Sequence, residues 1–446
     1  MSITYDLIFR GGTIVNQDGR HRADIGTKDG RIAAIGDLSQ ADAADTIDVK
    51  GLHILPGVID TQVHLREPGN EHKEDLETGG HAAVMGGVTT VFEMPNTKPP
   101  TTDPDALADK VKRARHRMQC DFAFYGGATT ENIDILPELE RQPGCCGIKV
   151  FMGSSTGTLL VEKDEDVLRV LKTIKRRAAF HSEDEFRLRE RRELALLGHV
   201  DTHPVWRDAE AAYMCTQRLL RLAREAGKRI HVLHISTAGE IPLLALHKDV
   251  ATVEVTPQHL TLAAPECYEA LGTFAQMNPP IRGHEHRDGL WNGLRAGIVD
   301  VIGTDHAPHT REEKEQTYPK SPSGMPGVQT MVPVMLNHVH EGRLTLERFV
   351  DLTSAGPQRV FGISCKGRIA VGYDADLTIV DLGAEREITD DWIVSKCGWT
   401  PYNGMKVKGW PIGTVIRGHR VMWEDELLGD ARGEPVQFME TLPHHV

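Results

Sequence analysis

The chain has 446 residues, of which 40% are hydrophobic and 26% are charged, an ordinary globular composition with room for one large domain and an accessory one. The formal net charge of -13 argues against a nucleic-acid binder, and no run approaches the ~20 apolar residues of a membrane span. The N-terminus lacks the basic start and apolar run of a signal peptide. The seven cysteines contain no Cys-x-x-Cys pair, so we predict reduced thiols in a cytoplasmic protein.

Both ends of the chain carry short apolar runs separated by turn signals. Residues 3–50 include Gly11-Gly12 and Asp18-Gly19 between such runs, and residues 364–424 repeat the pattern. We predict that the two ends pair into one small β-sandwich domain, built from residues 1–51 and residues 363–446. The last dozen residues are expected to form a loose or partner-docked tail.

The central part of the chain, residues 52–362, alternates β-type runs with helical stretches. Eight alternations predict an α/β fold, a (β/α)8 TIM barrel, whereas a doubly wound sheet would need a Gly-rich loop after its first strand, which this sequence lacks. The predicted strands are Ile54–Gln62, Val88–Met94, Asp121–Tyr125, Gly147–Phe151, Ala178–His181, Ile230–His234, Thr252–Thr256 and Asp300–Thr304. The predicted helices include Glu74–Met85, Asp105–Arg117, Asp164–Arg177 and Ala209–Ala226, and residues 310–326 are predicted to be a loop over one barrel face.

Metal-ligating residue types occur at or near the C-terminal ends of five predicted strands. In a barrel these ends converge on one mouth, where imidazole and carboxylate donors can hold a catalytic metal of the zinc kind. Taken singly, each has a structural explanation: a buried histidine, a salt-bridged lysine or an aspartate that caps a helix. Their joint placement favours a site. The residues are Gln62, His64, Lys149, His181, His234 and Asp305.

These segments resemble the cyclic amidohydrolases, and among them most closely the dihydroorotases. The resemblance runs nearly end to end and rests on specific motifs. They are IDTQVHLREPG at 59–69, MPNT at 94–97, GIKVFM at 147–152, LHIST at 233–237, NPPIR at 278–282, TDHAPH at 304–309 and GRIAVGYDADLTIVD at 367–381. The resemblance implies a zinc-dependent hydrolase with one or two zinc ions per chain.

The resemblance also assigns expected ligands. His64 matches the second histidine of a His-x-His pair, and His181 with His234 matches the ligands of a second metal. Lys149 matches a lysine that related enzymes carry as N6-carboxylysine, whose anionic carbamate can bridge two metals. Asp305 matches the catalytic carboxylate, which touches a metal and carries a proton.

Other matched residues are expected to bind substrate. Arg66 is the feature that separates dihydroorotases from hydantoinases, because a ring carboxylate calls for a planar, permanently charged partner. Asn96 and His309 match residues that hold the same carboxylate and ring, and Asn278 stands where relatives of other specificity usually have serine. The expected reaction interconverts dihydroorotate and N-carbamoyl-L-aspartate in pyrimidine biosynthesis. The expected partners are small molecules, a second copy or more of the chain (a dimer or tetramer), and aspartate carbamoyltransferase.

One residue departs from the family pattern. Gln62 replaces the first histidine of His-x-His, and an amide oxygen is a weaker zinc ligand than imidazole. Two alternatives therefore stay open beside the dihydroorotase. One is a cyclic amidase of the hydantoinase or dihydropyrimidinase kind, and the other is a catalytically inactive partner subunit.

Overall fold

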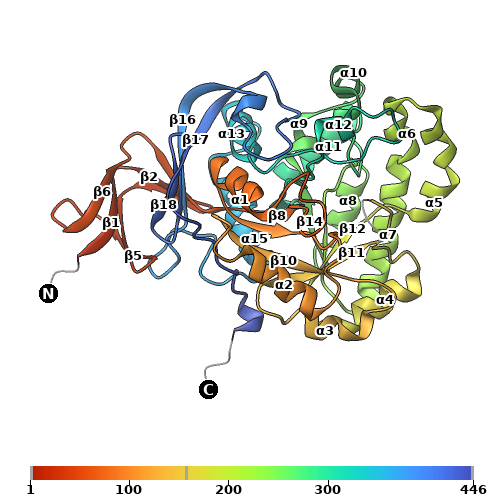
Figure 1. Cartoon of the computed structure of the whole chain (residues 1–446), viewed down its shortest axis with the longest axis horizontal. Coiled ribbons are helices and arrows are strands. Elements are labelled where there is room, and N and C mark those ends of the chain that lie inside the picture. Colours follow the sequence, from red (N-terminus) through yellow and green to blue (C-terminus); the bar gives the residue numbers. More distant parts are fainter. Residues whose placement is uncertain (1–3, 156–158, 443–446) are drawn as a thin grey trace.

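Eight parallel strands form a nearly closed barrel in the computed structural model, which describes residues 4–155 and 159–442 (Figure 1). Each strand pairs with the next in chain order, and a parallel bridge between Val63 and His306 brings the first segment beside the last. The predicted TIM-barrel class is confirmed. The barrel strands are β8 (Val58–Val63), β9 (Val88–Glu93), β10 (Asp121–Gly127), β11 (Cys145–Phe151), β12 (Ala178–His181), β13 (Ile230–Val232), β14 (Ala251–Val255) and β15 (Val301–Ile302).

The first predicted strand is in fact two strands in different sheets. Gly57 separates β7 (His53–Pro56), which belongs to the accessory sheet, from β8 of the barrel. A side chain at Gly57 would bring its Cβ to 2.3 Å from Thr89 Oγ1, so glycine is required where the chain passes between the sheets. A continuous apolar run cannot reveal this change of sheet, because both strands are buried.

The helices surround the barrel (Figure 1). The predicted helix over 209–226 is confirmed as α7, while α4 ends at Thr173 because Ile174 is extended and leads into β12. The helices are α1 (Leu76–Met85), α2 (Pro104–Ala114), α3 (Leu136–Leu139), α4 (Asp164–Thr173), α5 (Glu185–Glu190), α6 (His203–Trp206), α7 (Ala209–Ala226), α8 (Glu240–Ala245), α9 (Pro257–Thr261), α10 (Glu266–Leu271), α11 (His284–Arg295), α12 (Arg311–Lys314), α13 (Met331–His340), α14 (Leu346–Val350) and α15 (Gly356–Phe361). No helix in the described ranges is both long and apolar enough to cross a bilayer.

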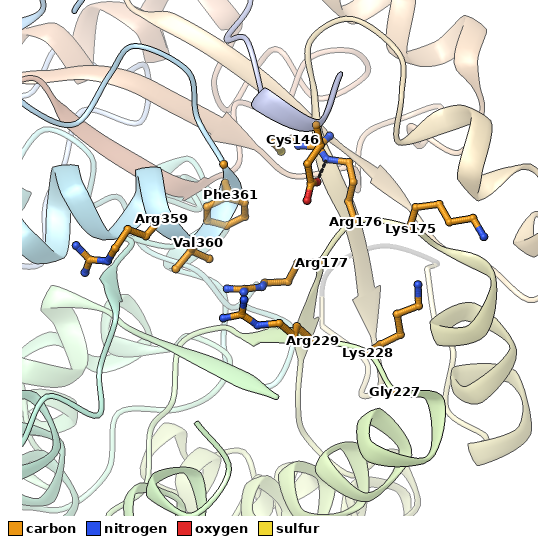
Figure 2. A pocket seen from close by; sticks show the side chains of 12 residues that line it. Cys146, Lys175, Arg176, Arg177, Gly227, Lys228, Arg229, Arg359, Val360 and Phe361 are labelled. Carbon is orange, nitrogen blue, oxygen red and sulfur yellow. Dashed lines mark hydrogen bonds and ion pairs between the residues drawn. The ribbon is translucent and has the colours of Figure 1, made fainter. Parts of the chain in front are cut away.

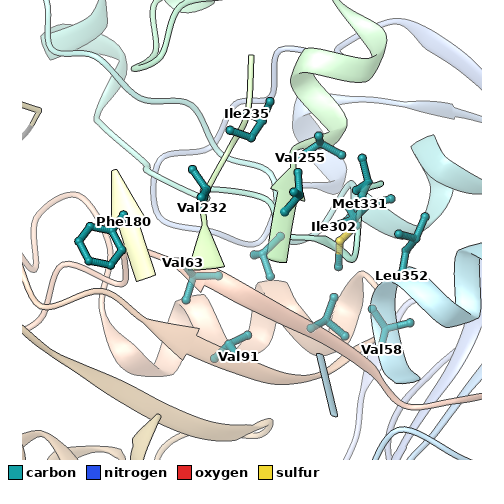
Figure 3. Packing of buried hydrophobic residues seen from close by; sticks show 14 of the residues in the cluster. Val58, Val63, Val91, Phe180, Val232, Ile235, Val255, Ile302, Met331 and Leu352 are labelled. Atoms are coloured by element: carbon teal, nitrogen blue, oxygen red, sulfur yellow. The ribbon is translucent and has the colours of Figure 1, made fainter. Parts of the chain in front are cut away.

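Alternating residues of the barrel strands face two different hydrophobic clusters. The outer cluster joins strands to helices and includes Val91, Phe180 and Val232, with Met331 from α13 (Figure 3). Their neighbours in sequence, such as Phe92, belong to a separate cluster that also contains Phe361 and Phe438. This two-residue period is the geometry of strands packed on both faces.

The two chain ends share a mixed sheet, as predicted. It has seven strands in the order β19-β18-β17-β16-β7-β2-β3, and a second, four-stranded sheet has the order β5-β4-β1-β6. The strand bounds are β1 (Tyr5–Arg10), β2 (Thr13–Asn16), β3 (Gly19–Arg22), β4 (Asp24–Lys28), β5 (Arg31–Gly36), β6 (Ala43–Asp48), β16 (Leu377–Ile388), β17 (Met405–Ile416), β18 (His419–Trp423) and β19 (Glu426–Leu427). The domain boundaries at residues 51/52 and 362/363 remain a prediction.

A buried ion network joins this sheet region to the barrel. Lys366 Nζ lies 2.6 Å from Asp121 Oδ2 and also contacts Asp376, and Arg417 Nη1 lies 2.5 Å from Asp121 Oδ1. The expectation of a loose C-terminal tail is wrong for residues 435–442. Phe438 is 1% exposed and its ring packs edge-on against Phe92, while residues 443–446 lie outside the described part of the chain.

Candidate active site

The predicted site residues gather at the C-terminal ends of the barrel strands. His64 and Arg66 follow β8, Asn96 follows β9, Lys149 lies in β11, His181 ends β12, His234 follows β13, and Asp305 follows β15. Apart from Asn96, which is partly buried, these residues are 8% exposed or less. The chain therefore brings polar groups from six strands into the same end of the barrel, where TIM-barrel enzymes have their active sites.

His64 and Asp305 form the first pair. His64 Nε2 lies 3.0 Å from Asp305 Oδ1, and Gln62 Nε2 donates to the same oxygen over 3.0 Å. Gln62 and His64 share one face, as the two-residue period of a strand requires, since both reach one carboxylate. His64 Nδ1 lies 2.9 Å from Asn96 Oδ1. Gln62 Oε1 is buried without a hydrogen-bond partner among the described residues.

His181 and His234 form the second pair. His181 Nδ1 lies 3.0 Å from His234 Nε2, and the other nitrogen of His181, Nε2, lies 2.9 Å from Glu183 Oε2. Glu183 also accepts from the Arg207 guanidinium, with 2.5 Å between Oε2 and Nη2. Burial raises the pKa of Glu183, but Arg207 and His181 outweigh it and hold the pKa below its usual range. An ionised Glu183 accepts a hydrogen bond from Nε2–H of His181, so His181 Nδ1 presents a lone pair to His234.

Both pairs have the electronic character of metal ligands. The amide oxygen of Asn96 accepts a hydrogen bond from Nδ1–H of His64, so His64 Nε2 also presents a lone pair, in this case to a carboxylate oxygen. His64 Nε2 and Asp305 Oδ1 are two acceptors 3.0 Å apart, which repel unless a proton or cation lies between them. In the second pair, the lone pair of His181 Nδ1 can accept a hydrogen bond from His234 Nε2–H or, with His234 in the other tautomer, both nitrogens can face one cation. Two ligands of one tetrahedral zinc are about 3.3 Å apart. Burial lowers the pKa of His64, His181 and His234, which favours the neutral imidazoles that metals bind.

The described histidine, cysteine and carboxylate side chains include no group of three or more arranged to hold a metal. The donors occur as two pairs, and the lysine predicted to connect them is Lys149. It is 1% exposed, and burial lowers its pKa to about 7, against the opposing charges of Asp305 and Glu254. With a pKa of about 7, about half of the amine is uncharged at neutral pH. The uncharged amine can react with carbon dioxide, and the resulting carbamate would supply the missing oxygen donors.

A cationic corner adjoins the first pair. Arg66 donates from Nε to Pro308 O over 3.1 Å, and its Nη2 lies 3.2 Å from His309 Nε2. Lys73 Nζ lies 3.1 Å from His309 Nδ1 and can only donate. Each ring nitrogen of His309 therefore faces a cationic donor, Lys73 at Nδ1 and Arg66 at Nε2, and Nε2 also lies 3.0 Å from Ser323 O. Burial lowers the pKa of Arg66 to about 10, so the guanidinium keeps its charge at neutral pH.

Asn278 is held by a histidine that the sequence pattern did not single out. His203 Nε2 lies 3.0 Å from Asn278 Oδ1 and 3.0 Å from Met277 O, and its Nδ1 lies 3.2 Å from Tyr318 Oη. Burial lowers the pKa of His203 to about 3, so the ring is neutral. His203 comes from the segment between β12 and α7, where no strand period marks it. Lys73, Glu183 and Arg207 were missed for the same reason.

Backbone conformation marks three of the predicted residues independently. Arg66, His234 and Asp305 have φ values of 66°, 37° and 48°, a region that residues with a Cβ rarely occupy. Each is located just after a barrel strand. Such conformations cost free energy and are concentrated at functional sites, where the surrounding structure holds them.

Comparison with known proteins agrees with this geometry. Residues 53–421 match the model of the amidohydrolase family. A dihydroorotase of Methanosarcina mazei is 38% identical over 98% of both chains, and an L-hydantoinase of Paenarthrobacter aurescens is 35% identical over 95% of this chain and 96% of its own. The solved L-hydantoinase from Arthrobacter aurescens superimposes with a TM-score of 0.93 at 32% identity, covering 97% of this chain and 100% of its own. The chain belongs to the amidohydrolase family.

Proposed function

We propose that this chain is a dihydroorotase, which interconverts dihydroorotate and N-carbamoyl-L-aspartate. One observation carries the choice of substrate. The Arg66 guanidinium is buried beside His309 at the barrel end that also holds the His64–Asp305 pair. A buried guanidinium of this kind matches a carboxylate in geometry and charge. A hydantoin or dihydropyrimidine ring without a carboxylate does not need such a partner.

The proposed metal ligands are His64, Asp305, His181, His234 and, as N6-carboxylysine, Lys149. One or two zinc ions bound there would supply Lewis acidity, which polarises the ring carbonyl and lowers the pKa of water to about 7. Gln62 makes the site next to His64 the weaker of the two. The proposal also includes a cytoplasmic homodimer or homotetramer and association with aspartate carbamoyltransferase.

Asp305 performs the proton transfer in this proposal. Its Oδ1 accepts from Gln62 and lies against His64, so the carboxylate is held in one orientation. Asp305 takes a proton from the attacking water and passes it to the ring nitrogen as the amide bond breaks. Arg66, Asn96 and His309 hold the substrate carboxylate and Asn278 lies beside the ring, so the carbonyl carbon is presented to the water in a fixed position.

A substrate panel tests this function with purified protein. We expect ring opening of dihydroorotate with kcat/KM at least 100-fold above that for hydantoin or dihydrouracil. Arg66→Met should raise KM for dihydroorotate about 10- to 100-fold, because a hydrogen bond to a charged group contributes about 1.5–3 kcal/mol. Its effect on hydantoin should be small. Arg311→Met, at an exposed arginine paired with Asp390, is the matched control.

The hydantoinase alternative is supported by the structural match at a TM-score of 0.93. It would be favoured if uncharged hydantoins were opened faster than dihydroorotate and if Arg66→Met affected both substrates equally. The inactive-subunit alternative rests on Gln62. Absence of turnover in protein that contains its full metal complement would favour it and would refute the dihydroorotase proposal.

A further inference from the structure

A second polar cavity lies at the opposite end of the barrel from the candidate active site. It has a volume of about 370 Å³ and is lined by residues that precede β12 and β13 and by the end of α15 (Figure 2). Arg177 immediately precedes β12, whose last residue is His181, and Arg229 immediately precedes β13. The cavity is therefore separated from the proposed metal ligands by the length of the barrel strands.

The lining of this cavity is strongly cationic. It contains six lysine or arginine side chains and one carboxylate, Glu440, in a chain whose overall net charge is -13. The cationic residues are Lys175, Arg176, Arg177, Lys228, Arg229 and Arg359.

Some of these cations already have structural partners. Arg176 pairs with Glu440 over 3.2 Å and donates to the carbonyl oxygens of Glu140 and Cys145. Arg359 Nη1 lies 2.7 Å from Asp351 Oδ1. These two arginines hold the C-terminal segment and α15 in place, so their charges are largely neutralised.

Arg177 and Arg229 have no ion-pair partner among the described residues. Figure 2 shows the two guanidinium groups next to one another and directed toward Val360, whereas Lys175 and Lys228 point the other way. Arg177 is half-buried and donates from Nη1 to Thr252 Oγ1 over 3.0 Å. Burial and the charge of Arg229 lower the pKa of Arg177 to about 10. An anion bound between the two guanidinium groups would reduce the repulsion between their charges.

We propose that this cavity binds a phosphorylated small molecule, with its phosphate between Arg177 and Arg229 and its organic part against Val360 and Phe361. Arginine forks match phosphate oxygens bidentately, and the cavity volume is within the range of small-molecule sites. The apolar wall beside the two arginines distinguishes this pocket from a simple cationic surface. Free inorganic phosphate shares the same charge chemistry, and the test separates the two ligands.

The test is isothermal titration calorimetry on the full chain with phenyl phosphate and with inorganic phosphate. We expect phenyl phosphate to bind one site per chain with a Kd at least tenfold lower than that of inorganic phosphate, and the Kd should increase with ionic strength. Equal affinities would retain the phosphate site and identify free phosphate as its ligand. No binding of either probe would overturn the proposal.

Variants locate the binding. Arg229→Glu reverses an exposed charge and should raise the Kd at least tenfold, while Arg192→Glu, at an exposed arginine outside the cavity, should leave it unchanged. Arg177→Gln should also weaken binding, with thermal unfolding used to confirm that the half-buried site still folds. Binding that survives Arg229→Glu with unchanged affinity and stoichiometry would place the phosphate elsewhere, such as at the active site, and would refute the proposal.

Discussion

Glu183→Gln tests whether the second histidine pair is a metal site. Glu183 is fully buried and accepts a hydrogen bond from Nε2–H of His181, which leaves the Nδ1 lone pair facing His234. The amide keeps the shape of the side chain but removes its charge, so it can no longer fix the His181 tautomer. Loss of such a partner commonly costs 10- to 100-fold in metal affinity, which is about 1.4–2.8 kcal/mol.

The same change should also destabilise the fold. Arg207 is 2% exposed, and the charge of Glu183 is its ion-pair partner. Removing one member of a buried ion pair costs about 3–5 kcal/mol, because the remaining charge is left without compensation. Chemical denaturation of the metal-free protein measures this loss, and competition with a fluorescent zinc chelator measures the change in affinity.

The control is Glu240→Gln. Glu240 is equally buried, at 1% exposure, but bonds to Thr216 and Thr237 rather than to a histidine. It should leave zinc affinity within about twofold of the native value. If Glu183→Gln also left zinc affinity unchanged while the protein remained folded, the tautomer argument and the proposed ligand role of His181 would both be wrong.

Three further predictions concern the first pair and the ion network. Asp305→Asn should lower kcat about 100- to 10,000-fold, as expected for loss of a general base, with metal content retained by elemental analysis; near-normal turnover would exclude the proposed role. Gln62→His should increase zinc bound per chain, since imidazole is the better ligand, and an unchanged stoichiometry would contradict the weak-site explanation. Asp121→Asn should cost about 3–5 kcal/mol near neutral pH by denaturant titration. Lys366 and Arg417 lower the pKa of Asp121 despite its burial. The ionised Asp121 therefore stabilises the folded protein fully above the unfolded pKa near 3.8, and this contribution is lost as the pH falls through the lower pKa of the folded state. The difference between native protein and variant should therefore shrink below about pH 4, and a constant difference would refute the assignment.

Much of the barrel and of its site follows from local pattern. Short buried strands separated by amphipathic helices predict the fold class, and strand ends predict where His181 and Asp305 meet their partners. Strand geometry has a period of two, so the sequence itself states which residues share a face, as Gln62 and His64 do. The division of Ile54–Gln62 between two sheets was missed, because its cause is a contact between Gly57 and Thr89 across the structure.

By itself, then, the sequence determined the barrel, the end of it that holds the candidate site and the ligand residues that converge there, because short-range periodicity controls which side chains point inward. Only the tertiary structure decided how those ligand residues are oriented and which other side chains hold them in place. Glu183 follows the end of β12, His203 and Arg207 lie at the two ends of the short helix α6, and the proximity of Arg177 to Arg229 depends on the spacing of neighbouring strands. Contacts of this kind arise from chain segments far apart in sequence, for which local pattern carries no signal.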